Sequence, residues 1–379
     1  MSSMIYLDYA AATPVNRKVL VAMQPYFSDV FYNPSAAYGL ARQTRADYSD
    51  AKHRIAQVIG AKPAEIVMTS GATESIALAI NGVGGGVLTT SIEHPAVLKN
   101  APNAKIIPVD EHGLVDVENV RKYITDDINL ISIGYANNEI GTVQNIKEIA
   151  AICRETRLER SNRGVDAPLV LHTDASQVAG LLDINVARLG VDLMTLNSDK
   201  CYGPKGVGLL YVRAGTKLEP IVRGGGQEMG FRSGTENVAG VVGFAVALEI
   251  VEKRRKTEVK RLEELRKNLE KYITYDIKNV KLNGSKKHCL SNILNFSIPG
   301  LDGERAVFAL DQKGVCMATG SACSANKGNR SHVLTAIGLT DELSDGSLRI
   351  SMGRGTTLEQ IEKLKPILLE VIENELKLS

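Results

Sequence analysis

Two side chains, Asp174 and Lys200, have types and a spacing that suit acid–base or covalent chemistry. They stand 26 positions apart, in "DASQ" and "LNSDKCYGPKG", and each follows a short apolar run that predicts a strand. The carboxyl ends of parallel strands meet at one edge of an open sheet, where ligands bind. One use of such a pair is pyridoxal phosphate chemistry, in which the lysine forms a Schiff base and the carboxylate keeps the pyridine nitrogen protonated. The alternative is a surface lysine and an aspartate that caps a helix.

The segment "TSGATES", residues 69–75, predicts a strand, a glycine turn and the start of a helix. The free N–H groups of the first helical turn, together with the hydroxyl of Thr73, would hold a phosphate group. The pattern matches neither GxxxxGK[ST] nor GxGxxG, so neither a P-loop nor a dinucleotide fingerprint applies. A simple helix cap is the alternative interpretation.

Polar side chains follow two further predicted strands. His94 in "SIEHPAV" would stack on a pyridine ring and handle protons, although a lone histidine is more often structural. Asn138 in "YANNEIGTVQ" would bond the cofactor's phenolic oxygen or a substrate carboxylate. Arg349 lies inside the apolar run "SLRISMG", where a buried guanidinium needs an anionic partner. An amino-acid α-carboxylate fits its planar fork, and a structural salt bridge is the alternative.

One cysteine, Cys323, lies in the polar segment "ATGSACSANKGNRS", residues 318–331. Cysteine side chains prefer the interior, so a thiol in a segment with little to bury predicts an exposed loop cysteine with a chemical role. The other cysteines are scattered and form no CxxC pair: they are Cys153, Cys201, Cys289 and Cys316. We therefore expect neither a disulfide framework nor a structural zinc site.

The elements that must position these side chains alternate along the first part of the chain. Short apolar runs such as "EIVMTS", "GVLTTS" and "PLVLHTDA" predict strands, and helical stretches such as residues 42–59 fall between several of them. Near-continuous apolar strands that alternate with helices are typical of a mainly parallel sheet covered on both faces. After about residue 236, one long helix followed by mixed strands and helices predicts a second, smaller α+β domain.

Composition excludes several classes of protein. The chain has 379 residues, of which 44% are hydrophobic and 23% charged, which is typical of a folded protein with room for two domains. A net charge of +2 gives no reason to expect direct nucleic-acid binding. No apolar run approaches the about 20 residues of a membrane span, and the N-terminus lacks the pattern of a signal peptide. We expect a cytoplasmic protein without membrane contact.

Taken in order, these stretches resemble the cysteine desulfurases of the NifS/IscS type, which are class V aminotransferase-like pyridoxal phosphate enzymes of fold type I. The resemblance covers nearly the whole chain through "YLDYAAATP", "NPS", "TSGATES", "EH", "NNEIG", "DASQ", "DK-YGPKG", "GGGQE", "RSGTEN", "GSACS" and "LRISMGR". It implies an α/β large domain with a mainly parallel seven-stranded sheet over residues 16–253. Residues 1–15 and 254–379 would form the small domain, which includes the cysteine loop at about 318–331.

The resemblance also assigns roles at matching positions. Lys200 looks like the Schiff-base lysine, His94 would stack on the ring and move protons, and Cys323 matches the catalytic cysteine. Asp174 would pair with the pyridine nitrogen, and Gln177 would bond the phenolic oxygen.

The remaining contacts that it implies involve the phosphate and the substrate. Ala72 and Thr73 would hold the phosphate, and Thr235 would reach the phosphate of a neighbouring subunit, which implies a homodimer. Asn138 and Arg349 would bind cofactor and substrate carboxylate.

The implied reaction turns L-cysteine into L-alanine and leaves the sulfur as a persulfide on Cys323. That persulfide would pass to an acceptor protein, either an iron–sulfur scaffold or a tRNA-thiolation enzyme. A cation near Cys323 would favour its thiolate, and Lys327 is the candidate by proximity in sequence. No resident metal is expected, although the resemblance allows Cys323 to ligate an iron–sulfur cluster transiently.

The chain departs from the family pattern just before the lysine. Relatives usually show a serine and a histidine, which help to hold the phosphate, where this chain has Asn197 and Asp199. An aspartate beside a phosphate is repulsive, so Asp199 must turn away or have a cationic neighbour. We also expect the insert 158–169 to be a surface loop. Two alternative functions stay open: a related lyase such as a selenocysteine lyase, and a degenerate paralogue that acts as a scaffold.

Overall fold

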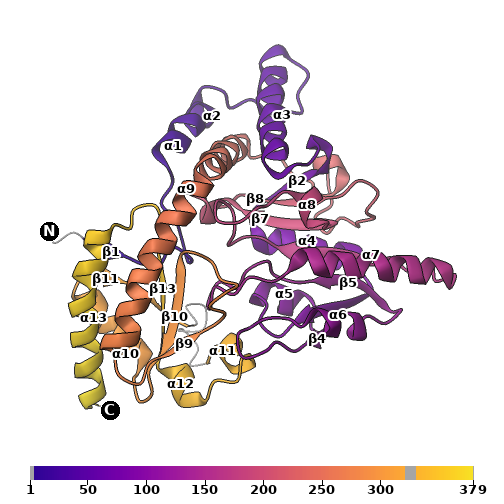
Figure 1. The fold of residues 1–379 in the computed structure, drawn as a ribbon. Coiled ribbons are helices and arrows are strands. Elements are labelled where there is room, and N and C mark those ends of the chain that lie inside the picture. Colours follow the sequence, from indigo (N-terminus) through magenta and orange to yellow (C-terminus); the bar gives the residue numbers. More distant parts are fainter. Residues whose placement is uncertain (1–3, 321–329, 379) are drawn as a thin grey trace.

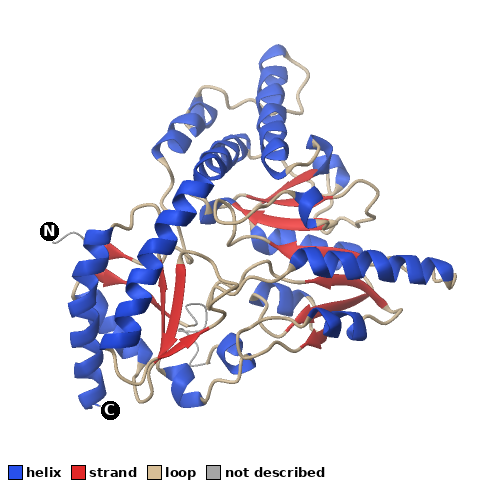
Figure 2. Ribbon diagram, in the orientation of Figure 1, coloured by secondary structure: helices blue, strands red, loops and turns tan. Residues whose placement is uncertain are grey.

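The computed structural model describes residues 4–320 and 330–378. Cys323 and Lys327 lie outside the described residues, so the roles expected of them rest on the sequence alone. Figures 1 and 2 show two groups of strands, each covered by helices, with the long helix α9 (Val238–Asp276) running past both.

The larger sheet confirms the expected seven-stranded, mainly parallel architecture. Its strand order is β2-β8-β7-β6-β5-β3-β4, in which only β8 runs antiparallel to its neighbours among the described strands. The strands are β2 (Ile66–Thr69), β3 (Gly86–Thr90), β4 (Lys105–Ile107), β5 (Ile128–Ser132), β6 (Val170–Asp174), β7 (Leu193–Asn197) and β8 (Gly208–Val212).

Helices cover both faces of this sheet, because successive strand residues point to opposite sides. In β5, Leu130 packs in the cluster that includes α4 and α5, whereas Ile131 packs in the cluster that includes α3, α7 and α9. Both residues are fully buried, which explains the near-continuous apolar runs in the sequence. The helices and 3-10 turns before α9 are α1 (Arg17–Met23), α2 (Pro25–Ser28), α3 (Gly39–Ile59), η1 (Pro63–Glu65), α4 (Ala72–Val83), α5 (Pro95–Asn100), α6 (Val117–Tyr123), α7 (Ile146–Asn162), α8 (Val186–Leu189), η2 (Ser198–Lys200) and η3 (Glu228–Gly230).

The smaller sheet is antiparallel, with the order β12-β13-β10-β9. Arg349 lies on β13, where it pairs with Asn295 of β10 on one side and Ala318 of β12 on the other. A separate parallel pair joins β1 to β11. The remaining elements are β1 (Ile5–Tyr6), β9 (Lys281–Asn283), β10 (Ile293–Ser297), α10 (Gly303–Gln312), β11 (Val315–Cys316), β12 (Ala318–Thr319), α11 (His332–Ala336), α12 (Asp341–Asp345), β13 (Ser347–Ser351) and α13 (Leu358–Leu378).

We propose the division into residues 16–253 and residues 1–15 with 254–379 as the domain boundary. The pairing of β1 with β11 supports it, since the N-terminal strand joins the C-terminal part of the chain. Helix α9 is continuous across the proposed boundary, so a rigid element links the two domains.

The expectation of a surface loop at 158–169 is wrong for its first part, because α7 continues to Asn162. The charged stretch contains Arg160, which is 2% exposed. Its guanidinium donates to the carbonyls of Ile128 at 2.9 Å and Pro168 at 3.0 Å, so it supplies hydrogen bonds to backbone acceptors of neighbouring segments. Sequence alone does not distinguish this buried arginine from its solvated neighbours. None of the helices in the described part of the chain is long and apolar enough to cross a membrane.

Candidate active site

A cavity of about 400 Å³ lies at the carboxyl ends of the central strands. Two larger hollows, of about 920 and 880 Å³, lie elsewhere and contain none of the residues predicted to bind the cofactor. The cavity brings together nine side chains that the sequence singled out: Ala72, Thr73, His94, Asn138, Asp174, Gln177, Asn197, Lys200 and Arg349. Parallel strand ends therefore converge as an open α/β sheet requires.

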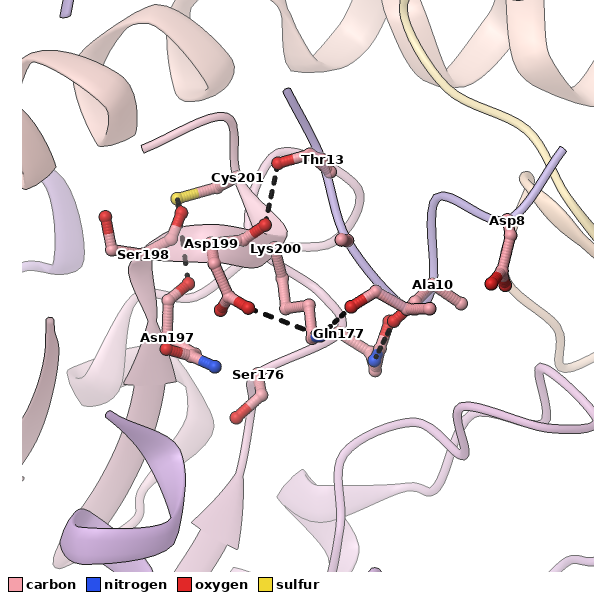
Figure 3. A network of polar contacts seen from close by, with 12 residues as sticks. Asp8, Ala10, Thr13, Ser176, Gln177, Asn197, Ser198, Asp199, Lys200 and Cys201 are labelled. Carbon is pink, nitrogen blue, oxygen red and sulfur yellow. Dashed lines mark hydrogen bonds and ion pairs between the residues drawn. The ribbon is translucent and has the colours of Figure 1, made fainter. Parts of the chain in front are cut away.

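Lys200 ends the short turn η2, which directly follows β7. Its amine donates to the carbonyl of Ala11 and lies 3.5 Å from Oδ2 of Asp199, as Figure 3 shows. The backbone carbonyl of Asp199 in turn accepts a 2.7 Å hydrogen bond from Thr13. An N-terminal segment remote in sequence thus fixes the lysine, and Asp199 has the cationic neighbour that its position demands.

Asp174 is the last residue of β6, and Ser176 holds its carboxylate in place. Oδ1 of Asp174 accepts hydrogen bonds from the backbone N–H of Ser176 at 3.0 Å and from its hydroxyl at 2.5 Å. We did not single out Ser176 from the sequence, although Asp-x-Ser is the usual signal of an Asx turn. The two hydrogen bonds orient the carboxylate, which could pair with the protonated pyridine nitrogen of the cofactor.

His94 lies at the start of α5, where its Nδ1 accepts a 3.1 Å hydrogen bond from the N–H of Ala96. Burial lowers the pKa of His94, while the nearby Asp174 acts in the opposite direction and Lys200 adds to the lowering. The imidazole is therefore neutral near pH 7. Since Nδ1 is an acceptor, the proton of the neutral ring lies on Nε2.

The start of α4 forms the end of the cavity that suits an anion. Gly71, with φ of 152°, precedes the helix, and no side chain of the described residues caps its first N–H groups. A Cβ built at Gly208 would lie 2.7 Å from the backbone of Gly71, so β8 passes close beneath this turn. Thr73 and Asn197 also line the cavity here. Backbone donors at a helix start, a carboxylate and a lysine in one cavity fit a pyridine ring that carries a phosphate.

Arg349 reaches the cavity from the smaller sheet. Its Nη2 lies 2.7 Å from Oδ1 of Asp8, and its Nη1 donates to the carbonyl of Asn138 at 3.1 Å. The side chain is 3% exposed, and its Nε has no hydrogen-bond partner among the described residues. Asp8 is thus the structural salt-bridge partner that the sequence left open, and it orients the fork while one buried donor stays unused.

Of three other predicted residues, one lines the cavity, one lies away from it, and one lies outside the described residues. Gln177 lines the cavity, and its amide donates to the carbonyl of Ala10 at 3.1 Å (Figure 3). Thr235 is exposed and does not line the cavity of its own chain. Cys323 lies outside the described residues.

Two buried acids near the cavity were missed by sequence reasoning. Burial raises the pKa of Glu93 to about 7, against hydrogen bonds from Thr90 and the N–H of Gly134 that lower it. Burial likewise raises the pKa of Glu139 to about 7, while Ser331 and Arg349 lower it. Nothing in the sequence predicted that these two acids are buried, because Asp and Glu side chains are mostly exposed. Among the described residues, no group of three or more His, Cys, Asp or Glu side chains forms a metal site.

The fold and the cavity define a pyridoxal phosphate enzyme of the aminotransferase-like fold type I. A solved structure titled "NIFS-LIKE PROTEIN" matches with a TM-score of 0.88 and 31% identity, over 98% of this chain and 100% of that chain. A structure titled "SspA in complex with cysteine" matches with a TM-score of 0.78 and 34% identity, over 92% of this chain and 98% of that chain.

The chain belongs to the family described as Aminotransferase class-V, whose model matches residues 5–364. Within that family its relatives are cysteine desulfurases. "Cysteine desulfurase IscS" of Dictyoglomus turgidum is 41% identical over 98% of this chain and 95% of the relative. "Cysteine desulfurase IscS 1" of Archaeoglobus fulgidus is 40% identical over 98% and 97%, respectively.

Proposed function

We propose that the chain is a pyridoxal phosphate-dependent cysteine desulfurase, which converts L-cysteine to L-alanine and receives the sulfur on Cys323. The observation that carries this is one cavity with Lys200 and Asp174 at the strand ends and a helix N-terminus without a side-chain cap. Full-length similarity to cysteine desulfurases supports the same reaction. The alternatives, a selenocysteine lyase or an inactive scaffold, are not favoured.

The side chains divide the work by their positions. Arg349, whose planar fork carries five N–H groups, would hold the substrate α-carboxylate through those that Asp8 and Asn138 leave unused, and Lys200 would move the α-proton. When bound, pyridoxal phosphate supplies an electron sink for the carbanion at the substrate α-carbon. Neutral His94 can hold or release a proton on Nε2. The thiolate of Cys323 would attack the substrate sulfur. Its electron pair would form the S–S bond, the electron pair of the broken carbon–sulfur bond would stay on the substrate carbon, and protonation of that carbon would lead to L-alanine.

We also propose that the enzyme is a homodimer. Large apolar side chains are exposed on α1, α2 and the loop after them, with Phe27 at 69% and Phe31 at 67%. Ile221, Val222 and Met229 are exposed in the segment that leads to Thr235. Large apolar side chains that are this exposed support an interface in these two segments. A second copy over this face would bring Thr235 toward a neighbouring phosphate site.

The sulfur acceptor would be an iron–sulfur scaffold or a tRNA-thiolation enzyme, and transient ligation of an iron–sulfur cluster by Cys323 belongs to the same proposal. Capture of acceptors by the persulfidated enzyme, with the Cys323→Ser protein as control, would separate these partners. A cytoplasmic location stays a prediction, since one relative is named "Cysteine desulfurase, mitosomal".

The test of the function combines spectroscopy with product analysis. The enzyme reconstituted with pyridoxal phosphate should show visible absorbance that Lys200→Ala removes. Cys323→Ser should keep this absorbance and exchange the α-proton of L-cysteine with solvent, yet release almost no sulfide. Cys289→Ser, which removes another partly exposed thiol, is the matched control and should desulfurate normally. A Cys323→Ser protein that produces sulfide at the parent rate would contradict the assignment.

A further inference from the structure

On the far side of the segment that carries Cys323, Arg330 pairs with Asp341 and Asp345 of α12, and the helix that follows, α11, also contacts the larger domain. Before the segment, β12 pairs with β13 in the smaller sheet. After it, α11 packs against loops of the larger sheet, where Val333, Leu334 and Ile337 form an apolar cluster with Ile92 and Ile140. Figure 1 shows α11 next to α12, in the region between the two sheets. Helix α11, which follows the cysteine segment, therefore packs against Ile92, a residue that also lines the cofactor cavity.

Ser331, which begins α11, makes two contacts through one hydroxyl. Its Oγ accepts a 3.2 Å hydrogen bond from the N–H of Leu334 and so caps the helix. The same hydroxyl donates to Oε2 of Glu139 at 2.5 Å, and both residues are buried. A hydrogen bond to a carboxylate is short and strong when it forms in a dry environment. The helix cap uses the Ser331 hydroxyl only as an acceptor, so the bond that this hydroxyl donates to Glu139 is a separate interaction.

The next residue, His332, contacts the loop that follows β3. Its Nε2 donates to the carbonyl of Glu93 at 2.8 Å. Glu93 directly precedes His94, and the charge of His332 is among the causes that lower the pKa of His94. Glu139 similarly follows Asn138, whose carbonyl accepts from Arg349. The two contacts of α11 thus reach the immediate neighbours of two residues in the cavity wall.

Glu139 is itself held by the surrounding backbone. Its N–H donates to Oδ1 of Asn137 at 2.8 Å, and its carbonyl accepts from Asn295 at 3.1 Å. Asn137 also donates to the carbonyl of Ile92 at 2.9 Å, which ties the loops after β3 and β5 together. A fixed carboxylate at this point gives Ser331 a defined partner.

We propose that Ser331 and His332 are positioning residues for sulfur transfer: their bonds to Glu139 and Glu93 set where the chain leaves the cysteine segment relative to the substrate. This inference rests on the proposed desulfurase function. Sulfur transfer needs the thiolate of Cys323 in line with the substrate sulfur, and small errors in placement are costly. Steps that precede the thiolate attack need only the cavity. Loss of either bond should therefore slow sulfur transfer without slowing the earlier steps.

The test separates these steps in the full-length enzyme loaded with pyridoxal phosphate. Exchange of the α-proton of L-cysteine in D₂O, measured by mass spectrometry, gives the rate of the steps that need only the cavity. Rapid-quench detection of the persulfide on the Cys323 peptide reports sulfur transfer. In Ser331→Ala we expect persulfide formation to fall about tenfold while α-proton exchange stays within about twofold of the parent. Glu139→Leu, which removes the acceptor of the Ser331 hydroxyl, should show the same split, and Ser331→Thr, which keeps the hydroxyl, should restore most of the rate.

Thr340 offers a matched control, because its hydroxyl caps the next helix, α12, by accepting from Leu343 at 3.3 Å. Thr340→Ala removes an equivalent cap but leaves the bond between Ser331 and Glu139 in place, so both rates should stay near the parent. His332→Phe, which removes the donor to Glu93, should act like Ser331→Ala.

Three outcomes would overturn the proposal. The first is an unchanged ratio of persulfide formation to α-proton exchange in Ser331→Ala and His332→Phe. The second is an equal fall of both rates, which would place these residues in support of the cavity. The third is a Thr340→Ala protein with the same defect, which would show that helix capping alone matters. If the parent enzyme neither exchanges the α-proton nor forms a persulfide, the proposed function fails, and this result is distinct from all three.

Discussion

Oδ2 of Asp199 lies 3.5 Å from Nζ of Lys200, while Oδ1 is buried without a hydrogen-bond partner among the described residues. The side chains of both residues are 19% exposed, so water screens the pair only partly. The aspartate that departs from the family pattern is therefore coupled to the lysine, and it is absent from the cavity wall. In the proposed reaction, the amine would give up this contact when it reacts with the cofactor.

We predict that Asp199→Asn binds pyridoxal phosphate more tightly than the parent. An ion pair with some exposure contributes about 0.2–1 kcal/mol, so its removal should raise the affinity by about 1.4- to fivefold. Titration of the cofactor-free protein, followed by visible absorbance, measures this change. Asp29→Asn, which alters an exposed aspartate in the loop after α2, should leave the affinity unchanged. Weaker binding in Asp199→Asn would show that the carboxylate supports the cofactor instead.

Arg349→Lys should raise the KM for L-cysteine. The lysine keeps the charge but loses the planar fork, and a hydrogen bond to a charged group contributes about 1.5–3 kcal/mol, so we expect an increase of about tenfold or more. Affinity for pyridoxal phosphate should change little. Steady-state kinetics and cofactor titration give both values. Arg266→Lys, at another buried arginine, is the control. A raised cofactor dissociation constant with an unchanged KM would contradict the substrate role.

Glu93→Gln should change how stability depends on pH. Burial raises the pKa of Glu93 from 4.5 to about 7, so between these values the folded protein binds more protons than the unfolded chain. The free energy of unfolding of the parent therefore falls as the pH rises from 4.5 to 7. Glutamine has no charge to bury, so we expect the variant to gain about 1–3 kcal/mol over the parent at pH 8 and little at pH 4.5.

Thermal or denaturant unfolding at both pH values measures this difference in stability. Glu111→Gln, at a residue whose side chain is 79% exposed, should show no such dependence. An equal effect of Glu93→Gln at both pH values would mean that the carboxyl does not change its protonation in this range.

Phe31→Glu should weaken the proposed homodimer. A charge on this exposed apolar face would have to be desolvated at an interface, so the dissociation constant should rise by at least tenfold. Sedimentation at several protein concentrations measures it, and Tyr275→Glu, at a residue that is 79% exposed on α9, serves as control. A parent protein that is monomeric at all concentrations would refute the dimer, whatever the variant does.

The sequence by itself predicted the architecture and most of the side chains that line the cavity. Apolar runs and helical periodicity predict the strands and helices, because strands buried on both faces must be apolar throughout. Asp174 and Lys200 were found from their residue types and from their places at strand ends, since parallel topology brings such ends together. Similar reasoning found the turn at Thr73, because a glycine before a helix leaves donors free.

Only the tertiary structure decided the long-range partners. The carbonyl of Ala11 lies at the lysine, Asp8 orients Arg349, and Ser331 contacts Glu139, each across more than a hundred residues of sequence. No local pattern encodes these contacts, because they arise when separate elements pack together. Burial is also a tertiary property: it turns Glu93 into a group that titrates near neutrality, whereas its sequence is that of an ordinary acid.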